Sequence, residues 1–192
     1  YNPDCNGAEQ GGVGPYQLIK IGGQRCSAAR GYLTPILDRP NLTVAIGARL
    51  LRVLINDKKA TGVEYDENGK STQAMASKAV LMCAGAVQSP QLLQLSGIGD
   101  ENELAAHGIE CLHHLPGVGK NLQDHLDVII QHYVTDPQMS LAGKIKKYKL
   151  PFIFLEYLLF KKGVGADNPL ETGAFLKTRP DLEVPDIQLH FI

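Results

Sequence analysis

A glycine placed between a short apolar segment and a helix is the feature of this sequence best suited to chemistry. Residues 79–84 are small or apolar and predict a buried strand, and Gly85 follows directly. Because Gly85 has no Cβ, the backbone there can approach a ligand closely, and Ala84 beside it is also small. The turn from a strand into a helix is where open α/β sheets bind nucleotides. The sequence therefore predicts a cofactor site at Ala84 and Gly85.

A helix is expected to follow this turn. In residues 85–99, GAVQSPQLLQLSGIG, Ser89 can cap a helix and Pro90 suits a first turn, where a missing N–H costs nothing. Three leucines then supply an apolar face, and the glycines of the final Ser-Gly-Ile-Gly end the helix. We expect a helix that begins at Ser89 and stops before Gly97.

The same stretch resembles the second signature of the glucose-methanol-choline (GMC) oxidoreductases, which are flavoenzymes that oxidise alcohols. The signature requires glycine and a small residue, Ser or Thr before Pro or Ser, two aliphatic residues, and Ser-Gly-aliphatic-Gly. Every fixed position is filled here. Residues 117–125, GVGKNLQDH, are similar to a second block of the family. The resemblance covers nearly the whole chain and is greatest to the choline dehydrogenase and alcohol dehydrogenase branch.

This resemblance implies an α/β chain, α+β overall, in two parts. Residues 1–134 would be the central part of an FAD-binding domain with a dinucleotide-binding fold, including a β-meander at about residues 50–77. Residues 135–192 would begin a substrate domain with an antiparallel sheet. The resemblance also implies oxidation of a small-molecule alcohol by hydride transfer to FAD, with an electron acceptor that the sequence does not identify.

Four residues are candidates for binding FAD on this basis: Leu50, Ala84, Gly85 and Ser89. Leu50 matches the family position whose backbone N–H and C=O hold the adenine, and backbone recognition tolerates any apolar side chain. From the residues alone, Leu50 is an ordinary strand residue, whereas the small residues at the strand–helix turn favour a cofactor contact at Ala84 and Gly85 over a simple tight turn. No catalytic residue is assigned, because the family's Gly-x-Gly-x-x-Gly fingerprint and its C-terminal catalytic histidine block are not in this sequence.

The chain begins at Tyr1 without Met and stops inside the alternating run 187–192. We expect an internal piece of a longer enzyme, inactive by itself. Two alternatives remain open. The protein could be an FAD-containing hydroxynitrile lyase of the same family, or a non-enzymatic truncated product that binds a nucleotide or a partner.

The remaining polar candidates are interpreted as structural. The polar loop 121–125 is expected to fix the chain between the two domains, since His125 has no evident catalytic partner. Adjacent His113 and His114 would point to opposite faces of a strand, so no metal site is predicted. The glycine-rich residues 11–14 predict a surface loop.

Composition narrows the classes of partner. A net charge of −1 gives no reason to expect nucleic acid. Four scattered cysteines without a Cys-x-x-Cys pair favour a reduced, cytoplasmic protein. The apolar run 150–160 contains Pro151 and Glu156 and is too short to span a bilayer. Lysines cluster around it, which is compatible with a membrane-surface helix, although a solvated face on a packed helix is commoner.

The other elements follow from periodicity and capping residues. Strands are expected over residues 16–21, 42–46, 51–56, 61–66, 72–77, 109–112, 128–134, 173–176 and 187–192. Helices are expected over 27–37 with Ser27 as cap, over 100–107 with Asp100 as cap, and over 140–162 with an interruption at Pro151.

Overall fold

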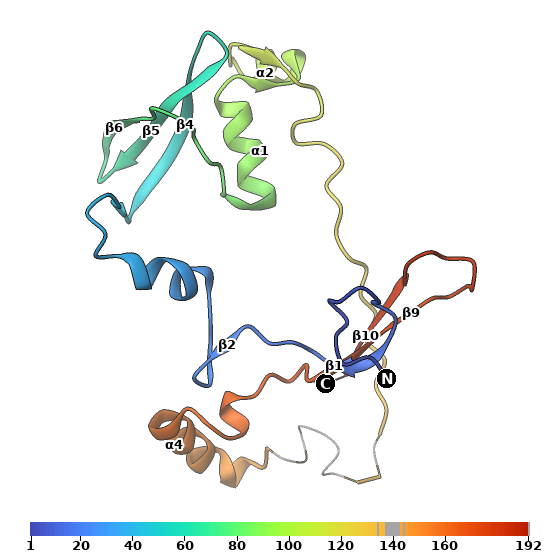
Figure 1. Ribbon diagram of the computed structural model, residues 1–192. Coiled ribbons are helices and arrows are strands. Elements are labelled where there is room, and N and C mark those ends of the chain that lie inside the picture. The colour runs from blue at the N-terminus through green and yellow to red at the C-terminus, as the bar shows by residue number, and fades with distance from the viewer. Residues whose placement is uncertain (134, 137–142, 144, 192) are drawn as a thin grey trace. The chain divides into compact units, whose positions relative to one another are not determined.

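The computed structural model describes residues 1–133, 135–136, 143 and 145–191. The chain folds as two compact units, one formed by residues 1–42 with 130–192 (unit 1) and the other by residues 43–129 (unit 2). Each unit mixes helices and strands (Figure 1). The chain passes from unit 2 back to unit 1 at residue 130, near the predicted domain boundary at 134, and that boundary stays a prediction. The passage from unit 1 to unit 2 at residue 43 was not expected from the sequence.

Unit 2 is built on the predicted meander. Strands β4 (Ala48–Asn56), β5 (Lys59–Glu67) and β6 (Lys70–Met75) form an antiparallel sheet in that order. Both hairpins turn on two residues with positive φ, namely Asp57 and Lys58 in the first and Asn68 and Gly69 in the second. Such turns match the right-handed twist of the strands that they join. The meander and its two turns are therefore confirmed.

One helix packs along the edge of this sheet. Helix α1 (Gly85–Leu95) lies beside β4 (Figure 1), and the buried apolar residues of the unit are Val53, Leu92, Leu104 and Val118. The strand β7 (Ile98–Gly99) follows and pairs in parallel with β8 (His113–His114). Between them lies α2 (Glu101–Ala106). Asp100 caps α2 as predicted, because its carboxylate accepts hydrogen bonds from the N–H groups of Asn102 and Glu103.

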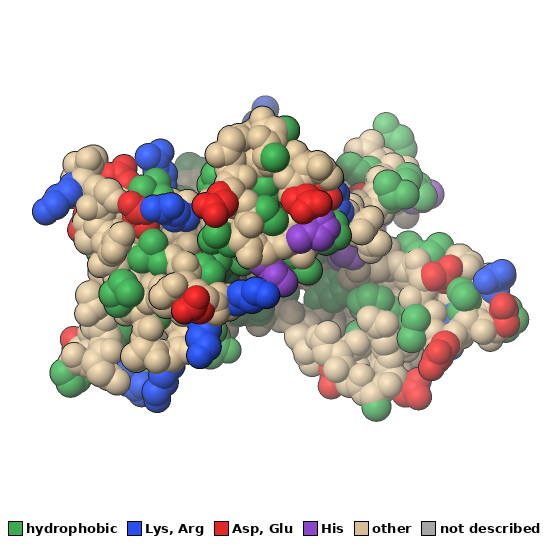
Figure 2. Space-filling view, turned by 90° about the horizontal axis from the view of Figure 1, so that it is seen from above, with side chains coloured by type: hydrophobic (Ala, Val, Ile, Leu, Met, Phe, Trp, Pro, Cys, Tyr) green, Lys and Arg blue, Asp and Glu red, His purple; other side chains and the backbone are tan. Residues whose placement is uncertain are grey.

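Several predicted strands do not form. Residues 79–84 form no strand, with Leu81 86% exposed and Cys83 exposed rather than buried. Residues 42–46, 109–112 and 128–133 also lack strand pairing, and residue 134 lies outside the described residues. A strand needs a hydrogen-bonding neighbour as well as an apolar pattern, and the described residues supply none here. Exposed hydrophobic side chains are visible between the charged groups in Figure 2.

Unit 1 contains a sheet that joins distant parts of the chain. Its antiparallel order is β1 (Gly12–Pro15), β9 (Thr172–Leu176) and β10 (Ile187–Phe191). The predictions for β9 and β10 are confirmed. The prediction of a surface loop over residues 11–14 is wrong, because pairing with β9 makes a strand from residues that show no strand pattern themselves. Within β9, Ala174 is almost fully buried, at 1% exposed.

The other segments of unit 1 are short. The expected strand 16–21 is reduced to β2 (Lys20–Ile21), which pairs with β3 (Gln24–Arg25). The expected helix 27–37 is a π-helical turn, η1 (Ala29–Leu33), followed by a 3₁₀ turn, η2 (Thr34–Ile36). Ser27 does accept a hydrogen bond from the N–H of Arg30, at 3.3 Å.

The final helical region of unit 1 also differs from the prediction. It consists of the 3₁₀ turn η4 (Lys147–Lys149), helix α4 (Leu150–Phe160) and the 3₁₀ turn η5 (Val164–Ala166). Pro151 lies in the first turn of α4 instead of interrupting a longer helix, which is where its missing N–H is tolerated. Part of the expected helix, residues 140–142 and 144, lies outside the described residues.

Candidate cofactor site

The predicted turn at Gly85 forms the start of α1. Gly85 has φ +90°, a conformation that side-chain-bearing residues rarely adopt, and a Cβ added there would meet nothing within 4 Å. The described protein atoms therefore leave space at Gly85, and the glycine is required by its backbone conformation. The N-cap residue, Ala84, makes no side-chain capping hydrogen bond. The N–H groups of residues 84–87 have no partner within the helix, since the first four, counted from the N-cap residue, never do.

Ser89 does not cap the helix. Helix α1 begins four residues earlier than predicted, so Ser89 is half-buried in its second turn and Pro90 lies inside it. The positive φ of Gly85 turns the extended segment into the helix, and Ala86 to Gln88 continue it without a cap. Pro90 cannot donate to the carbonyl of Ala86, so one helical hydrogen bond is missing at this point. The capping prediction is therefore wrong, and Ser89 remains only a predicted cofactor contact.

Leu50 lies on β4, the edge strand of its sheet, half-buried and opposite Tyr65. The next pairs are Arg52 with Glu64 and Val53 with Val63, so Leu51 is an extra residue that forms a β-bulge. The Val53 N–H is directed away from β5, because it donates to the Oγ of Ser96 at 2.8 Å.

The bulge decides where the backbone of Leu50 faces. Hydrogen-bonded and non-hydrogen-bonded pairs alternate along an antiparallel ladder. Val53 and Val63 form a non-hydrogen-bonded pair. The preceding pair along the ladder, Arg52 with Glu64, is therefore hydrogen-bonded, and the pair before it, Leu50 with Tyr65, is again non-hydrogen-bonded. The N–H and C=O of Leu50 therefore face the free edge of β4, on the same side as the N–H of Val53. Without the bulge they would be used by β5.

Ser96 fixes α1 against this edge. Its hydroxyl accepts from the N–H of Val53 at 2.8 Å and donates to the carbonyl of Leu92 at 2.5 Å, and the side chain is only 4% exposed. The sequence indicated Ser96 only as part of the helix end, because nothing in the periodicity shows a partner 43 positions away.

The four predicted residues therefore lie in one unit, on two elements that contact each other. Leu50 is on β4, Ala84 and Gly85 are at the start of α1, and Ser89 is in the second turn of α1. In Figure 1 the first residues of β4 and of α1 lie at the same end of unit 2. Backbone donors and an acceptor thus lie near one end of the unit, a combination suited to a ligand with many polar oxygens and nitrogens.

The face of the meander opposite Val53 is charged. Arg52 bonds to Glu64 at 2.6 Å, Arg49 pairs with Asp66 at 3.4 Å, and the hydroxyl of Ser71 donates to Glu64 at 2.6 Å. The hydrogen bonds from Ser71 and then from Arg52 lower the pKa of Glu64. These contacts link the three strands on the solvent-facing side of the sheet. They do not involve the backbone N–H and C=O groups at the free edge of β4.

The polar loop after β8 is exposed. The N–H of His125 donates to its neighbour Asp124 at 2.8 Å, and Asn121 has a positive φ of 55°. His114 Nδ1 accepts from the N–H of Glu101 at 3.3 Å. Within the described ranges, no three His, Cys, Asp or Glu side chains are placed to hold a metal ion. In those same ranges, no helix is long and apolar enough to cross a membrane.

Comparison with known families identifies the class of protein. The family model for GMC oxidoreductases matches residues 1–127, so the chain belongs to the GMC oxidoreductase family. The expected fold class, with helices and strands mixed, agrees with the flavoenzyme structures that this chain resembles. The resemblance inferred from residues 85–99 and 117–125 is thereby confirmed, including its choline dehydrogenase branch.

Curated relatives match nearly the whole length of this chain. The chain is 43% identical over 190 residues to an oxygen-dependent choline dehydrogenase of Staphylococcus xylosus, covering 99% of this chain and 34% of the relative. It is 45% identical over 192 residues to a protein of the same name from Citrobacter koseri, covering 98% and 34%. The chain thus spans about a third of the length of the curated relatives that it matches.

Among solved structures, a pyridoxine 4-oxidase from Mesorbium loti is 38% identical, with a TM-score of 0.59 over 63% of this chain and 24% of that one. An FAD-dependent oxidoreductase from Chaetomium thermophilum is 26% identical, with a TM-score of 0.71 over 88% of this chain and 30% of that one.

Proposed function

We propose that the whole protein is an FAD-dependent enzyme that oxidises an alcohol, with choline or a similar amino alcohol as substrate. The family match over residues 1–127 supports this proposal most strongly, together with relatives at 43–45% identity whose names are choline dehydrogenase. When bound, FAD would supply the acceptor for the hydride of the alcohol carbon, and oxidation of the alcohol to the aldehyde would also require a base to take the hydroxyl proton. No residue of this chain is assigned as that base.

The proposed contribution of this chain is to hold part of FAD. At the free edge of β4, the backbone N–H and C=O of Leu50 can recognise a base through hydrogen bonds, which needs no particular side chain. At the start of α1, the N–H groups after Ala84 and Gly85 have no helical partner and lie at the positive end of the helix dipole, where phosphate or hydroxyl oxygens bind favourably. We retain residues 1–134 as the cofactor part and 135–192 as the substrate part of this proposal.

The first test is the visible spectrum of the whole protein, purified without added cofactor and then mixed with choline in the absence of oxygen. We expect flavin bands that bleach when choline is added. Bands that persist with choline and with other alcohols would contradict oxidation and favour the lyase alternative. A protein without flavin bands, even after incubation with FAD, would refute the cofactor assignment.

A pair of glycine variants tests the start of α1. Gly85 and Gly108 both have positive φ, +90° and +69°, and a Cβ at either would meet nothing within 4 Å. Gly85→Ala and Gly108→Ala should therefore cost similar stability, about 1–2 kcal/mol each. Only Gly85→Ala should lower the ratio of bound flavin to protein. Equal flavin content in the two variants would exclude a cofactor role for Gly85.

A second pair tests the backbone of Leu50. Proline is tolerated on an edge strand where the N–H that it removes is not used by the ladder. Leu50→Pro should leave the sheet folded but weaken FAD binding, whereas Leu50→Ala keeps the N–H and should bind FAD nearly as well as the wild type. Fluorescence titration of the apoprotein with FAD measures both. If Leu50→Pro binds FAD as tightly as Leu50→Ala, the backbone of Leu50 is not a donor to the cofactor.

A further inference from the structure

Helix α4 is unusual in having almost no polar surface. Its eleven residues, LPFIFLEYLLF, include only one charged side chain, Glu156, and none of them is buried. A helix that is apolar all round is normally covered by protein or by lipid. Six of its side chains are at least half exposed, and five of these lie on one broad side of the helix: Phe152, Phe154, Leu155, Leu158 and Leu159. The sixth, Phe160, is the last residue of α4 and lies outside that side.

The opposite side of α4 faces the protein. Ile153 and Tyr157, four residues apart, lie under the turn η5, and a Cβ added to Gly165 would come within 3.0 Å of the Tyr157 side chain. The turn η5 is in turn fixed to the β2–β3 hairpin, because Lys20 donates to the carbonyl of Ala166 at 3.0 Å and lies 3.7 Å from the Asp167 carboxylate. The exposed apolar side of α4 is thus the side turned away from η5 and the β2–β3 hairpin.

The charge around α4 is positive at both ends. Residues 145–163 contain five lysines and one glutamate, which gives a formal charge of +4 in a chain whose total is −1. Lys146, Lys147 and Lys149 precede the helix, and Lys161 and Lys162 follow it. Cationic groups at the two ends of an apolar helix fit a surface that is apolar inside and anionic outside.

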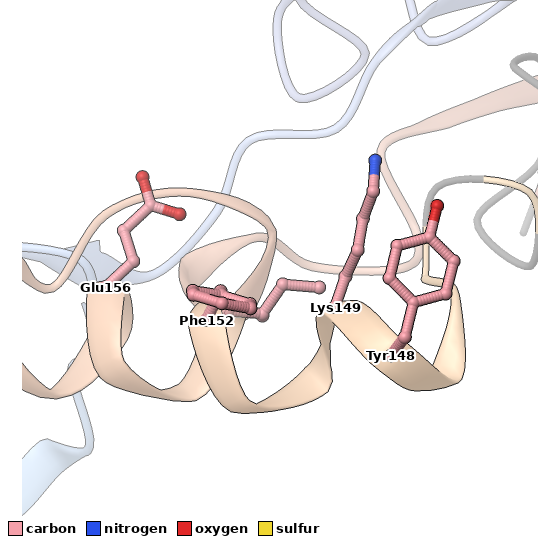
Figure 3. A pocket seen from close by; sticks show the side chains of 5 residues that line it. Tyr148, Lys149, Phe152 and Glu156 are labelled. Carbon is pink, nitrogen blue, oxygen red and sulfur yellow. The ribbon is translucent and has the colours of Figure 1, made fainter.

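The polar ends of three side chains at α4 point to the same side of the helix. Figure 3 shows the hydroxyl of Tyr148, the amine of Lys149 and the carboxylate of Glu156 pointing to the same side of the helix, with Phe152 between them. These residues and Ile153 line a hollow of about 530 Å³ that is open to solvent and mostly apolar. Tyrosine and lysine side chains arranged in this way keep their polar ends at a membrane interface while their apolar parts enter it.

We propose that α4 binds the surface of an anionic phospholipid bilayer and lies in its plane. The helix is about 16 Å long, half of the roughly 30 Å hydrocarbon core, so it cannot span the bilayer. The five exposed apolar residues enter the acyl boundary, and the flanking lysines contact lipid phosphates. This inference does not depend on the cofactor or on the substrate.

The test is co-sedimentation of the whole protein with vesicles, made either of phosphatidylcholine alone or of phosphatidylcholine mixed with phosphatidylglycerol. We expect binding to the mixed vesicles, much weaker binding to the neutral ones, and release by salt. Lys146→Gln combined with Lys147→Gln should weaken binding at least about tenfold, because each lysine near an anionic surface contributes roughly a fivefold factor. The matched control removes two exposed lysines from the hairpins of unit 2, Lys58→Gln with Lys70→Gln, and should bind as the wild type does.

A second variant tests the apolar side. Phe154→Asp should abolish sedimentation with mixed vesicles, and an unchanged circular dichroism spectrum would show that it still folds. The proposal fails if the wild type binds neither vesicle, if it binds both equally, or if the lysine pair and its control behave alike. It also fails if light scattering shows a dimer that Phe154→Asp dissociates, since a second copy would then cover α4.

Discussion

The contact between Ser96 and Val53 allows a sharp test of how α1 is held on the meander. In Ser96→Ala the Val53 N–H loses the hydroxyl oxygen that accepts its hydrogen bond at 2.8 Å, at a site where Ser96 is 4% and Val53 7% exposed. The carbonyl of Leu92 keeps a partner, because the N–H of residue 96 also donates to it at 3.0 Å. One buried donor is therefore left unsatisfied.

A buried donor without a partner costs about 1–3 kcal/mol. Hydrogen exchange at the Val53 amide measures this directly, and the opening equilibrium should rise roughly 5- to 150-fold in Ser96→Ala. The matched control is Ser89→Ala, the same chemical change in the same helix, at a half-buried serine that makes none of the side-chain hydrogen bonds found among the described residues. This control should stay within about 0.5 kcal/mol of the wild type.

The reasoning would be refuted by an unchanged exchange rate at Val53 in Ser96→Ala, or by an equal change in both variants. The first result would mean that the amide is protected by the sheet and not by the serine. The second would mean that any change in α1 loosens the unit. Either outcome would also weaken the proposed cofactor site, since that site requires the start of α1 to be held near β4.

Three further predictions concern elements outside the site. Gly173→Ala should lower the melting temperature through a loss of about 1–3 kcal/mol, because the new methyl group would overlap the ring of Tyr16, and an unchanged melting temperature would contradict the packing of β9. Asp100→Ala should cost about 1 kcal/mol by removing the cap of α2, and Asp100→Asn, which can still accept, should recover most of it in urea denaturation. Ser71→Ala should raise the pKa of Glu64 towards its ordinary value in an NMR titration.

The lowered pKa of Glu64 also makes the stability of the meander depend on pH. The pKa of Glu64 is lowered in the folded chain, so its contribution to stability is present above the unfolded-state pKa and is lost as the pH falls through the folded-state pKa. Acid should therefore weaken the meander within the carboxylate range, and Ser71→Ala should shift this loss to higher pH. An NMR titration in which the Glu64 carboxyl is unaffected by Ser71→Ala would show that the hydroxyl is not its main donor.

The family and the local turns could be read from residues in sequence order. The Ser-Gly-Ile-Gly ending, the block 117–125, the Asn68–Gly69 turn and the Asp100 cap each depend on neighbours a few positions away. Such features are specified by backbone preference and short-range hydrogen bonds, and they are the ones that the structure reproduces. Ala84 and Gly85 could be predicted as cofactor residues from the small residues at the strand–helix turn, whereas Leu50 could be named only through the family resemblance.

What the tertiary structure decided is everything that needs a distant partner. Residues 79–84 have the composition of a buried strand but no neighbouring strand among the described residues, while β1 has little strand pattern and is made a strand by β9, some 160 positions away. The bulge at Leu51, which turns the backbone of Leu50 to a free edge, depends on the register of β4 against β5. Sheet pairing and buried hydrogen bonds join residues far apart in sequence, so local composition cannot specify them.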